Sequence, residues 1–349
     1  MAVRTVLVTG GAGYLGSCLV DLLGRQGYTV ISLDNGMIPD HESSHENVRH
    51  IRADIRDVSD WRSLMPTVDA VVHLAGLVGD PACSVNHDLT WEINYLGTVY
   101  VAEAARKAGV QRFVFASTCS NYGLSFGTSA DTFSPLFPQS VYAASKIQAE
   151  HYLLSVRGAD FSPAILRFAT LFGISPRMRF DLAINIMTAR AAMEGSILVI
   201  NGEQWRPFLH VRDCAKIVAS LIPVDWSRPG AEIYNCGSDR ENFKISEIGR
   251  IIQEEIPLAT LDIKKSADDM RDYRVDFDLQ PNSINFNSPI GVREGIREIR
   301  DALEQGLFAD YSNRDYNNYE TLIHRLQEGH LSTSLRHDHP WPELVSSSV

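Results

Sequence analysis

The chain has 349 residues, of which 44% are hydrophobic and 21% charged, with a formal net charge of −11 at pH 7. These values are ordinary for a globular protein with one large two-lobed domain or two smaller ones, and the negative charge argues against nucleic acid as the main partner. The apolar runs near the N-terminus are short and interrupted by glycine, so we expect neither a signal peptide nor a membrane span.

Apolar, β-rich segments alternate with helical patterns through the first half of the chain. The predicted strands are Thr5–Thr9, Thr29–Leu33, Val48–Arg52, Ala70–His73, Arg112–Ala116 and Ala164–Arg167. The predicted helices are Tyr14–Gln26, Asp57–Leu64, Leu89–Ala108 and Ser140–Val156. This alternation predicts an α/β fold of the Rossmann type, a doubly wound parallel sheet with helices on both faces.

After Gly173 the rhythm changes to a helix at 181–194, a strand at 197–200, a helix at 212–221 and mixed fragments up to about residue 305. We expect a smaller C-terminal α/β substrate lobe here. The predicted division is a Rossmann domain at 1–172 with a returning segment near 206–236, and a second lobe at 173–205 and 237–310. Residues 330–349 lack periodicity and are predicted to form a flexible tail.

The five cysteines are scattered, odd in number and without C-x-x-C spacing. They are Cys18, Cys83, Cys119, Cys214 and Cys236. This usage is typical of reduced thiols, and we expect the protein to be cytoplasmic.

A glycine-rich turn, Leu7-Val-Thr-Gly-Gly-Ala-Gly-Tyr-Leu-Gly16, lies between the first predicted strand and the first predicted helix. Gly10, Gly13 and Gly16 permit a tight turn, close backbone approach to a pyrophosphate and close helix–strand packing, while the helix N-terminus supplies amides. A plain glycine-rich turn is the alternative, but the strand before and the helix after it favour a dinucleotide site.

Asp34 ends the second predicted strand, about 20 residues further on, where a carboxylate accepts hydrogen bonds from an adenine ribose. A carboxylate repels a 2′-phosphate, so NAD is favoured over NADP; a turn or N-cap aspartate is the alternative. Asp54-Ile55 and Leu74–Gly76 follow the third and fourth strands, where the adenine and the dinucleotide backbone would pass.

Tyr142 and Lys146 are four residues apart in a predicted helix, so their side chains share one face. An ammonium there is expected to lower the pKa of the tyrosine from about 10 and make it a general base toward an alcohol. In an isolated helix the same spacing is usually a packed tyrosine beside a solvated lysine.

These motifs resemble one family. The segments TGGAGYLG, LDNG, ADIRD, VVHLAG, STCSNYG, YAASK, LRFATLFG and WRPFLHVRD follow the order found in extended short-chain dehydrogenases/reductases, the sugar-nucleotide epimerase and dehydratase group. The resemblance implies bound NAD, a nucleoside-diphosphate sugar as partner, and Thr118, Tyr142 and Lys146 as catalytic residues, the lysine also binding the nicotinamide ribose. It further implies a homodimer formed through the helices predicted at 89–108 and 140–156.

The strand ends and the resemblance together predict the ligand-binding residues. The cofactor set is Gly10, Gly13, Tyr14, Leu15, Gly16, Asp34, Asn35, Asp54, Ile55, Leu74, Ala75, Gly76, Asn94, Tyr142 and Lys146. The substrate set is Thr118, Tyr142, Thr170, Asn185, Arg206 and Arg271.

The two residues after Thr118 bear on the reaction. Sugar-nucleotide 4,6-dehydratases resemble Thr-Asp-Glu here, and uronic acid decarboxylases carry a glutamate at the second of those positions, whereas this chain has Cys119 and Ser120. The missing carboxylates favour oxidation and re-reduction at one carbon, which is epimerisation at C4 through a 4-keto intermediate. Cys119 as a second acid/base is the alternative to small-residue packing, which we favour.

Two rival functions follow from the same motifs. A 4-ketosugar-nucleotide reductase on this fold would consume NAD(P)H, and a non-catalytic dinucleotide sensor would keep only the Rossmann domain. Sensors generally lack the tyrosine and lysine pair, so Tyr142 and Lys146 argue against the second rival.

At the substrate end, Arg206 matches the family arginine that grips the diphosphate, since a guanidinium forks onto phosphate oxygens. Asn185 matches an asparagine near the same diphosphate, whereas Thr170 departs from the asparagine of many 4-epimerases. Asp269 departs from a family arginine, for which Arg271 or Arg274 would substitute.

Several further polar residues have competing interpretations. Arg177 and Arg179 could favour an acidic sugar such as a uronate, or could be solvated or contact phosphate. His210 and Asp213 are interpreted as local structure. His41, His45 and His50 lack further ligands at strict spacing, so we expect a solvated loop and no metal.

Overall fold

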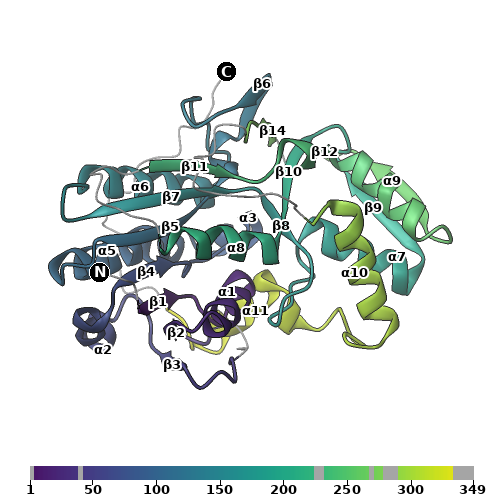
Figure 1. Ribbon diagram of the computed structural model, residues 1–349. Helices are drawn as coiled ribbons and strands as arrows, with labels where there is room; N and C mark the ends of the chain where they lie inside the picture. Colours follow the sequence, from purple (N-terminus) through teal and green to yellow (C-terminus); the bar gives the residue numbers. More distant parts are fainter. Residues whose placement is uncertain (1–3, 38–41, 224–231, 267–270, 278–289, 333–349) are drawn as a thin grey trace.

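The computed structural model describes residues 4–37, 42–223, 232–266, 271–277 and 290–332. Its largest sheet has seven parallel strands in the order β11-β7-β5-β4-β1-β2-β3 (Figure 1). The strands are β1 (Thr5–Thr9), β2 (Thr29–Asp34), β3 (Val48–Arg52), β4 (Ala70–His73), β5 (Arg112–Thr118), β7 (Ser162–Phe168) and β11 (Glu232–Cys236). The order reverses between β1 and β4, and such a switch point opens a crevice at the carboxyl ends of the strands.

Helices cover both faces of this sheet, because its central strands are apolar on both sides. On one face α1 (Tyr14–Arg25) packs against α8 (Val211–Leu221), and on the other α5 (Gly97–Lys107) packs against α6 (Val141–Ser155). The predicted Rossmann-type α/β class is confirmed.

Short helical segments complete the Rossmann part. They are α2 (Val58–Trp61), η1 (Arg62–Thr67), α3 (Asp80–Val85), α4 (His87–Trp91), the π-helical η2 (Glu92–Leu96) and η3 (Cys119–Tyr122). The helix predicted over 89–108 is therefore divided into three consecutive pieces. None of the helices within the described ranges combines the length and apolar character needed to cross a membrane.

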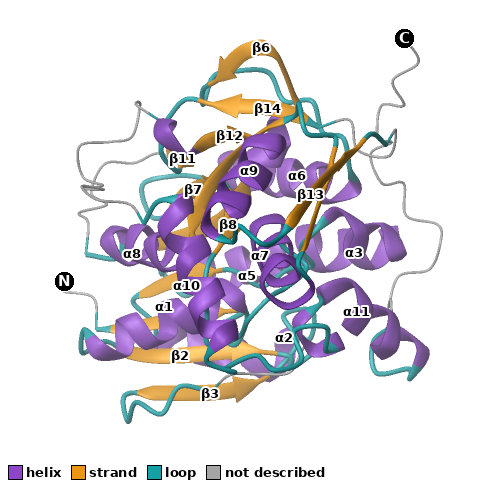
Figure 2. Cartoon of the chain, turned by 90° about the vertical axis from the view of Figure 1, so that its right-hand side faces the viewer, coloured by secondary structure: helices purple, strands orange, loops and turns teal. Residues whose placement is uncertain are grey.

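A second lobe lies beside the carboxyl ends of the sheet (Figures 1 and 2). Its strands form small sheets, one from β8 (Thr170–Phe172), β10 (Trp205–His210) and β12 (Asn242–Lys244), and another from β9 (Ser196–Ile200) and β13 (Thr260–Lys264). Its helices are α7 (Ala183–Glu194), α9 (Ile245–Glu255) and α10 (Val292–Glu304). A further pair, β6 (Leu124–Ala130) and β14 (Asp272–Val275), joins a loop of the Rossmann part to the later chain.

The chain crosses between the two parts more than once. It leaves the large sheet after β7, returns with α8 and the edge strand β11, and leaves again for η4 (Asp239–Glu241) and β12. The predicted domain limits stay a prediction, although β10 pairs within the small sheet and not with the large one.

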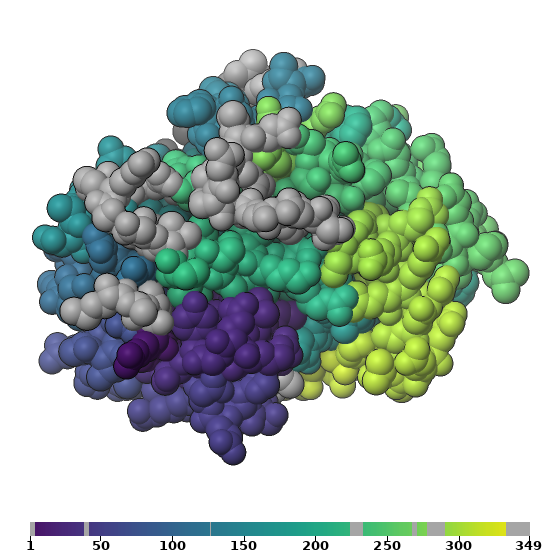
Figure 3. Space-filling view, viewed as in Figure 1, coloured from purple at the N-terminus to yellow at the C-terminus, as the bar shows by residue number. Residues whose placement is uncertain are grey.

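The C-terminal residues form η5 (Arg314–Tyr316) and α11 (Asn318–Gln327). On the face in Figure 3, the yellow-green atoms of α10 and the yellow residues that follow it lie beside the green atoms of α9. Leu322 in α11 and Leu331 beyond it are buried in the core that α5 and α6 share with the sheet. Residues 330–332 of the predicted tail are thus described, whereas 333–349 lie outside the described residues.

Candidate active site

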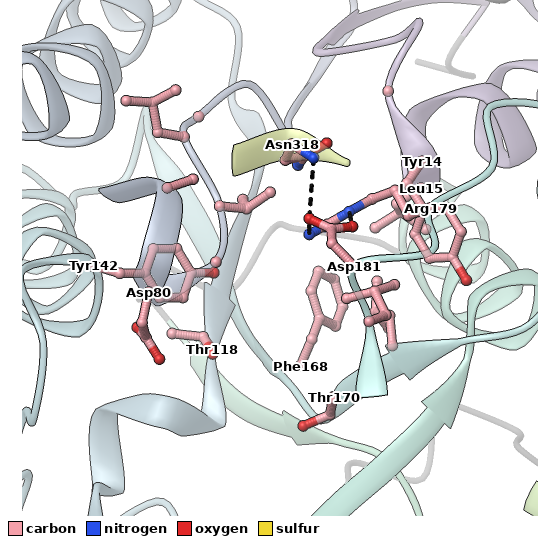
Figure 4. Close-up of a pocket in the computed structure, with 18 of the residues that line it drawn as sticks. Tyr14, Leu15, Asp80, Thr118, Tyr142, Phe168, Thr170, Arg179, Asp181 and Asn318 are labelled. Carbon is pink, nitrogen blue, oxygen red and sulfur yellow. Dashed lines mark hydrogen bonds and ion pairs between the residues drawn. The ribbon is translucent and has the colours of Figure 1, made fainter. Parts of the chain in front are cut away.

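A cavity of about 850 Å³ lies at the carboxyl ends of the parallel strands and extends to the second lobe. Figure 4 shows its two ends: Tyr142, Thr118 and Asp80 gather on one side, and Tyr14, Arg179 and Asn318 on the other. The volume falls in the upper part of the range typical of small-molecule sites, roughly 300–1,000 Å³.

The glycine-rich turn forms one wall of this cavity. Gly10 has φ +72°, a conformation that disfavours other residues, and a Cβ on Gly16 would lie 2.0 Å from the carbonyl oxygen of Gly10. A Cβ on Gly13 would meet only that carbonyl, at 3.2 Å, so the space beside Gly13 is open toward the cavity. This open cradle at the N-terminus of α1 fits a dinucleotide diphosphate.

The carboxylate of Asp34 is fixed beside the turn. It accepts hydrogen bonds from the backbone N–H groups of Ala12 at 3.2 Å and Gly36 at 3.0 Å. Asn35 donates to Asp54 at 3.0 Å, and Arg56 pairs with Asp54 at 3.0 Å. Although burial opposes it, the contact with Arg56 lowers the pKa of Asp54. This end of the cavity, where an adenosine is expected, is therefore lined by charged side chains in fixed positions.

Most of the predicted cofactor residues line the cavity, but Asn94 does not. Its amide is fully buried, accepts from the backbone N–H of Leu77 at 2.7 Å and donates to Ser145 at 3.2 Å. Asn94 thus ties the segment after β4 to α6, and a direct contact between Asn94 and a cofactor gains no support from this geometry.

Thr118, Tyr142 and Lys146 converge at the other end of the cavity. The Tyr142 side chain is hydrogen-bonded to Thr118, which ends β5 and also accepts from the backbone N–H of Ser120 at 3.1 Å. Lys146, one turn after Tyr142, donates from Nζ to the carbonyl of Ala116 at 3.0 Å. Their catalytic assignment stays a prediction, which this proximity supports.

The expected lowering of the Tyr142 pKa by Lys146 is wrong. Burial raises the pKa of Tyr142 above its ordinary value, with Cys83 and Asp80 adding to the rise, while the Thr118 hydrogen bond opposes it. The ammonium of Lys146 bonds to a backbone carbonyl instead of the phenol, and burial lowers the pKa of Lys146 to about 8. The spacing of four residues correctly predicted that Tyr142 and Lys146 share one helix face, but it could not predict that the fold removes both side chains from water.

Replacing Lys146 with methionine is expected to stabilise the NAD-free protein near neutral pH. The Lys146 pKa falls from 10.5 unfolded to about 8 folded. Below about pH 8 the buried charge therefore costs stability, on the order of 3 kcal/mol, and this cost disappears as the pH rises toward the unfolded pKa. Urea unfolding of both proteins across this range should show the advantage of Lys146→Met shrinking; a constant difference would contradict the expectation.

Behind this site lies a buried ion pair between Arg167 of β7 and Glu150 of α6, with an N–O distance of 2.6 Å. Glu150 also accepts hydrogen bonds from Ser117 and from Asn121, the latter at 2.8 Å. Arg167 donates to Tyr122 at 3.0 Å. The network holds the end of β5, and with it Thr118, against the helix that carries Tyr142.

Cys119 and Ser120 have different surroundings. Cys119 is buried, donates to the carbonyl of Arg167 at 3.2 Å and does not line the cavity; burial raises the pKa of its thiol well above the usual value. Ser120 lines the cavity and is hydrogen-bonded to the hydroxyl of Tyr273 at 3.2 Å. Cys119 is therefore a packing residue, as we favoured, and not an acid/base group.

Sequence reasoning missed Asp80, which lies close to Tyr142 and Thr118 at the start of α3 (Figure 4). Asp80 accepts a hydrogen bond from Ser140 at 2.6 Å and forms an ion pair with Arg271. Asp80 could have been noticed as a carboxylate soon after the fourth predicted strand. Its ion pair with Arg271, 191 positions later in the chain, could not be inferred from the sequence.

At the second lobe, Arg206 and Arg271 both line the cavity, as does Thr170. Arg206 donates to the carbonyl of Arg271 at 2.6 Å and stacks over the ring of Tyr273 at 5.0 Å. Asp269, the departure from the family pattern, lies outside the described residues. Two guanidinium groups on one wall suit a substrate diphosphate.

Asn185 lies behind the cavity wall. It is fully buried, accepts from the backbone N–H of Gly173 at 3.0 Å and donates to Tyr14 at 3.2 Å and to the carbonyl of Arg179 at 2.8 Å. Its predicted contact with the substrate diphosphate gains no support, because the amide is engaged in fixing the segment before α7.

Arg177 and Arg179 are not solvated, since only 6% and 7% of their surfaces are exposed. Arg179 donates from Nε and Nη2 to the two carboxylate oxygens of Asp181, each at 2.8 Å. These two donors are therefore not available to the carboxylate of an acidic sugar. Arg177 donates to Asn318 at 2.8 Å. Of the three open interpretations, a solvated loop is excluded.

The remaining polar residues have structural partners. His210 is fully buried and lies 3.0 Å from Glu298, while Asp213 pairs with Lys216 at 2.8 Å. His50 contacts the carbonyl of Ser43, and His41 lies outside the described residues. The described residues contain no group of three or more His, Cys, Asp or Glu side chains arranged to hold a metal.

Comparison with known proteins gives a consistent result. The NAD dependent epimerase/dehydratase family matches residues 6–237. A putative UDP-glucose 4-epimerase of Methanocaldococcus jannaschii is 30% identical, in an alignment that covers 84% of this chain and 96% of that protein. UDP-glucuronic acid decarboxylase 1 of Arabidopsis thaliana is 28% identical, in an alignment that covers 90% of this chain and 71% of that protein. The structure of MoeE5 with UDP-glucuronic acid and NAD has a TM-score of 0.77 and 28% identity, covering 86% of this chain and 99% of its own.

Proposed function

The chain belongs to the NAD-dependent epimerase/dehydratase family, and from this membership we propose that it is an epimerase of a nucleoside-diphosphate sugar, acting at C4 through a transient 4-keto intermediate. NAD is its cofactor. Similar proteins include both a putative epimerase and a decarboxylase, and these reactions differ in the acid and base groups that they need at the site.

The absence of a carboxylate at positions 119 and 120 supports epimerisation. Elimination of water or of carbon dioxide needs an acid or base beside the reacting carbon in addition to the tyrosine. Cys119 is turned into the core, and Ser120 bonds to Tyr273. The carboxylates of Asp80 and Asp181 are engaged in ion pairs with arginines.

The proposed reaction uses Tyr142 twice. Its phenolate takes the proton of the C4 hydroxyl as C4 loses hydride, which leaves a C4 ketone and a neutral tyrosine. After the sugar turns, hydride returns to the opposite face of C4 and Tyr142 gives its proton back to the oxygen. Thr118 holds that oxygen through a hydrogen bond during both the oxidation and the reduction. Bound NAD supplies the hydride acceptor, and no cofactor is consumed.

Bound NAD would supply positive charge beside Tyr142, which favours the phenolate. Lys146 donates to the carbonyl of Ala116 and so fixes the end of β5 next to that tyrosine. Arg206 and Arg271 hold the diphosphate of the substrate. The homodimer and the cytoplasmic location stay predictions.

The proposal predicts conversion without added cofactor. Purified protein should carry NAD and interconvert C4 epimers when incubated with UDP-, dTDP-, GDP- or CDP-hexoses. With substrate deuterated at C4, both epimers should keep the label at C4, because the same hydrogen leaves and returns. NMR of the sugar nucleotides measures both the ratio of epimers and the position of the deuterium.

Other outcomes identify the rival functions. Strict dependence on added NAD(P)H points to a reductase, and loss of carbon dioxide from a uronate points to a decarboxylase. Migration of deuterium from C4 to C6 indicates a dehydratase. Tightly bound NAD with no conversion of any sugar nucleotide would leave the non-catalytic sensor.

A further inference from the structure

The C-terminal residues 314–332, here called the strap, lie across the Rossmann part near the cofactor end of the cavity. Its helix α11 packs beside α3 (Figure 2). Leu322, in the middle of the strap, and Leu331, near its end, are both buried in the core. Burial at two separated points means that the strap is docked along its length.

The start of the strap forms part of the cavity wall. Asn317, Asn318 and Tyr319 line the cavity, and the backbone N–H of Phe180 donates to the carbonyl of Tyr316 at 2.8 Å. Figure 4 shows Asn318 next to Asp181 and Arg179, at the end where Tyr14 and Leu15 begin helix α1. The strap therefore reaches the place where the glycine-rich turn presents its amides.

Asn318 holds two buried arginine groups at this place. Its side-chain oxygen accepts from Nη2 of Arg177 at 2.8 Å, and its backbone N–H donates to Asp181 at 3.1 Å. Asp181 in turn binds Arg179. In the described part of the chain Arg177 forms no ion pair, and burial, with Arg179 nearby, lowers its pKa to about 10.

Asp181, Asp34 and Asp315 act on Arg177 only through longer-range attraction, and a buried guanidinium without a direct ion pair is unfavourable unless an anion reaches it. Arg177 and Arg179 both line the cavity that the glycine-rich turn also lines. The diphosphate of a dinucleotide is an anion of suitable shape for such groups, which bind phosphate oxygens through two donors at once.

The end of the strap is tied to the adenosine end of the cavity. Arg325 donates from Nε to the carbonyl of Met37 at 3.0 Å, and Met37 lines the cavity after Asp34 and β2. Arg56, which pairs with Asp54 after β3, donates to the carbonyl of Ser332 at 2.8 Å. The strap thus contacts the loops that hold both the diphosphate and the adenosine ends.

We infer that the strap completes the NAD site: Asn318 positions Arg177 at the diphosphate, and NAD leaves only after the strap detaches from the β2 and β3 loops. The inference concerns retention of the cofactor and does not depend on which reaction the sugar undergoes.

The test measures NAD release from the purified holoenzyme without any sugar nucleotide. Isotope-labelled NAD is bound, excess unlabelled NAD is added, and the loss of label is followed over time. Asn318→Ala and Arg325→Ala should each release NAD about tenfold faster than the parent, as expected for loss of a hydrogen bond to a charged group. Gln327→Ala, an exposed position on the same helix, is the matched control and should release NAD at the parental rate.

The two variants distinguish docking of the whole strap from a single contact made by Asn318. Arg325 is not among the residues that line the cavity, so Arg325→Ala can affect NAD release only by loosening the strap. Parental release rates in both variants overturn the inference. Faster release from Asn318→Ala alone also overturns it, since Asn318 would then be one contact and the strap would not control exit. Circular dichroism and thermal unfolding of each variant verify the fold, and Arg325→Met removes the same donor while keeping the apolar stem if Arg325→Ala unfolds.

Discussion

Replacing Tyr142 with phenylalanine is expected to lower kcat at least about 10³-fold while NAD stays bound, because the variant loses only the hydroxyl that transfers the proton. The Tyr142 ring lies beside Thr118, on the opposite side of the cavity from Tyr14 and Leu15, which follow the glycine-rich turn (Figure 4). Steady-state rates of sugar-nucleotide conversion, together with the NAD content of the purified variant, measure the two effects separately.

Tyr152 provides a matched control on the same helix, α6. Its hydroxyl donates to Glu103 at 2.7 Å, outside the cavity, so Tyr152→Phe should keep kcat within about twofold of the parent. If Tyr142→Phe keeps the parental rate, Tyr142 is not the proton-transfer group. If both variants lose activity equally, the defect lies in the packing of α6 and not in catalysis.

Replacing Arg167 with methionine is expected to reduce the free energy of unfolding by about 3–5 kcal/mol, since it leaves the carboxylate of Glu150 buried without its charge partner. Both side chains are almost completely inaccessible, with 4% and 1% exposure. Chemical denaturation measures the loss. Activity should also fall, because the network positions the end of β5 and therefore Thr118.

Two comparisons make this expectation specific. Arg106→Met removes an ion pair with Glu103 whose arginine is 46% exposed, and it should reduce the free energy of unfolding far less than Arg167→Met does, because solvent screens an exposed pair. The double variant Arg167→Met with Glu150→Leu removes both buried charges and should recover much of the lost stability. A loss from Arg167→Met no larger than that from Arg106→Met would show that the buried pair contributes nothing specific.

The sequence predicted the elements whose signal is local. The strands that became β1, β3 and β4 were predicted with the observed bounds. β1 and β4 are apolar runs between turn residues, whereas β3, with the sequence Val-Arg-His-Ile-Arg, is an edge strand with no buried residue. The glycine-rich turn was predicted because its spacing, its preceding strand and its following helix are all contiguous in the chain. Tyr142 and Lys146 share a helix, so their common face followed from periodicity.

Features built from distant segments could not be predicted. Asp80 meets Arg271, and Arg177 meets Asn318, across separations of 191 and 141 positions. Asn185 matched a family position but is buried behind the cavity wall, which no local pattern indicates. The rise in the pKa of Tyr142 likewise depends on burial by the whole fold.

The return of α8 and β11 to the large sheet has a consequence for protein engineering. β11 pairs with β7 and α8 packs on α1, so the second-lobe residues that line the cavity are encoded in separate stretches on either side of structural residues of the Rossmann part. A chimera that takes its second lobe from a relative through a single recombination point would also take α8 and β11 from that relative, and both would then have to pack on the parental sheet. Recombination with relatives of different substrate preference therefore needs at least two donor fragments, with α8 and β11 kept from the parent.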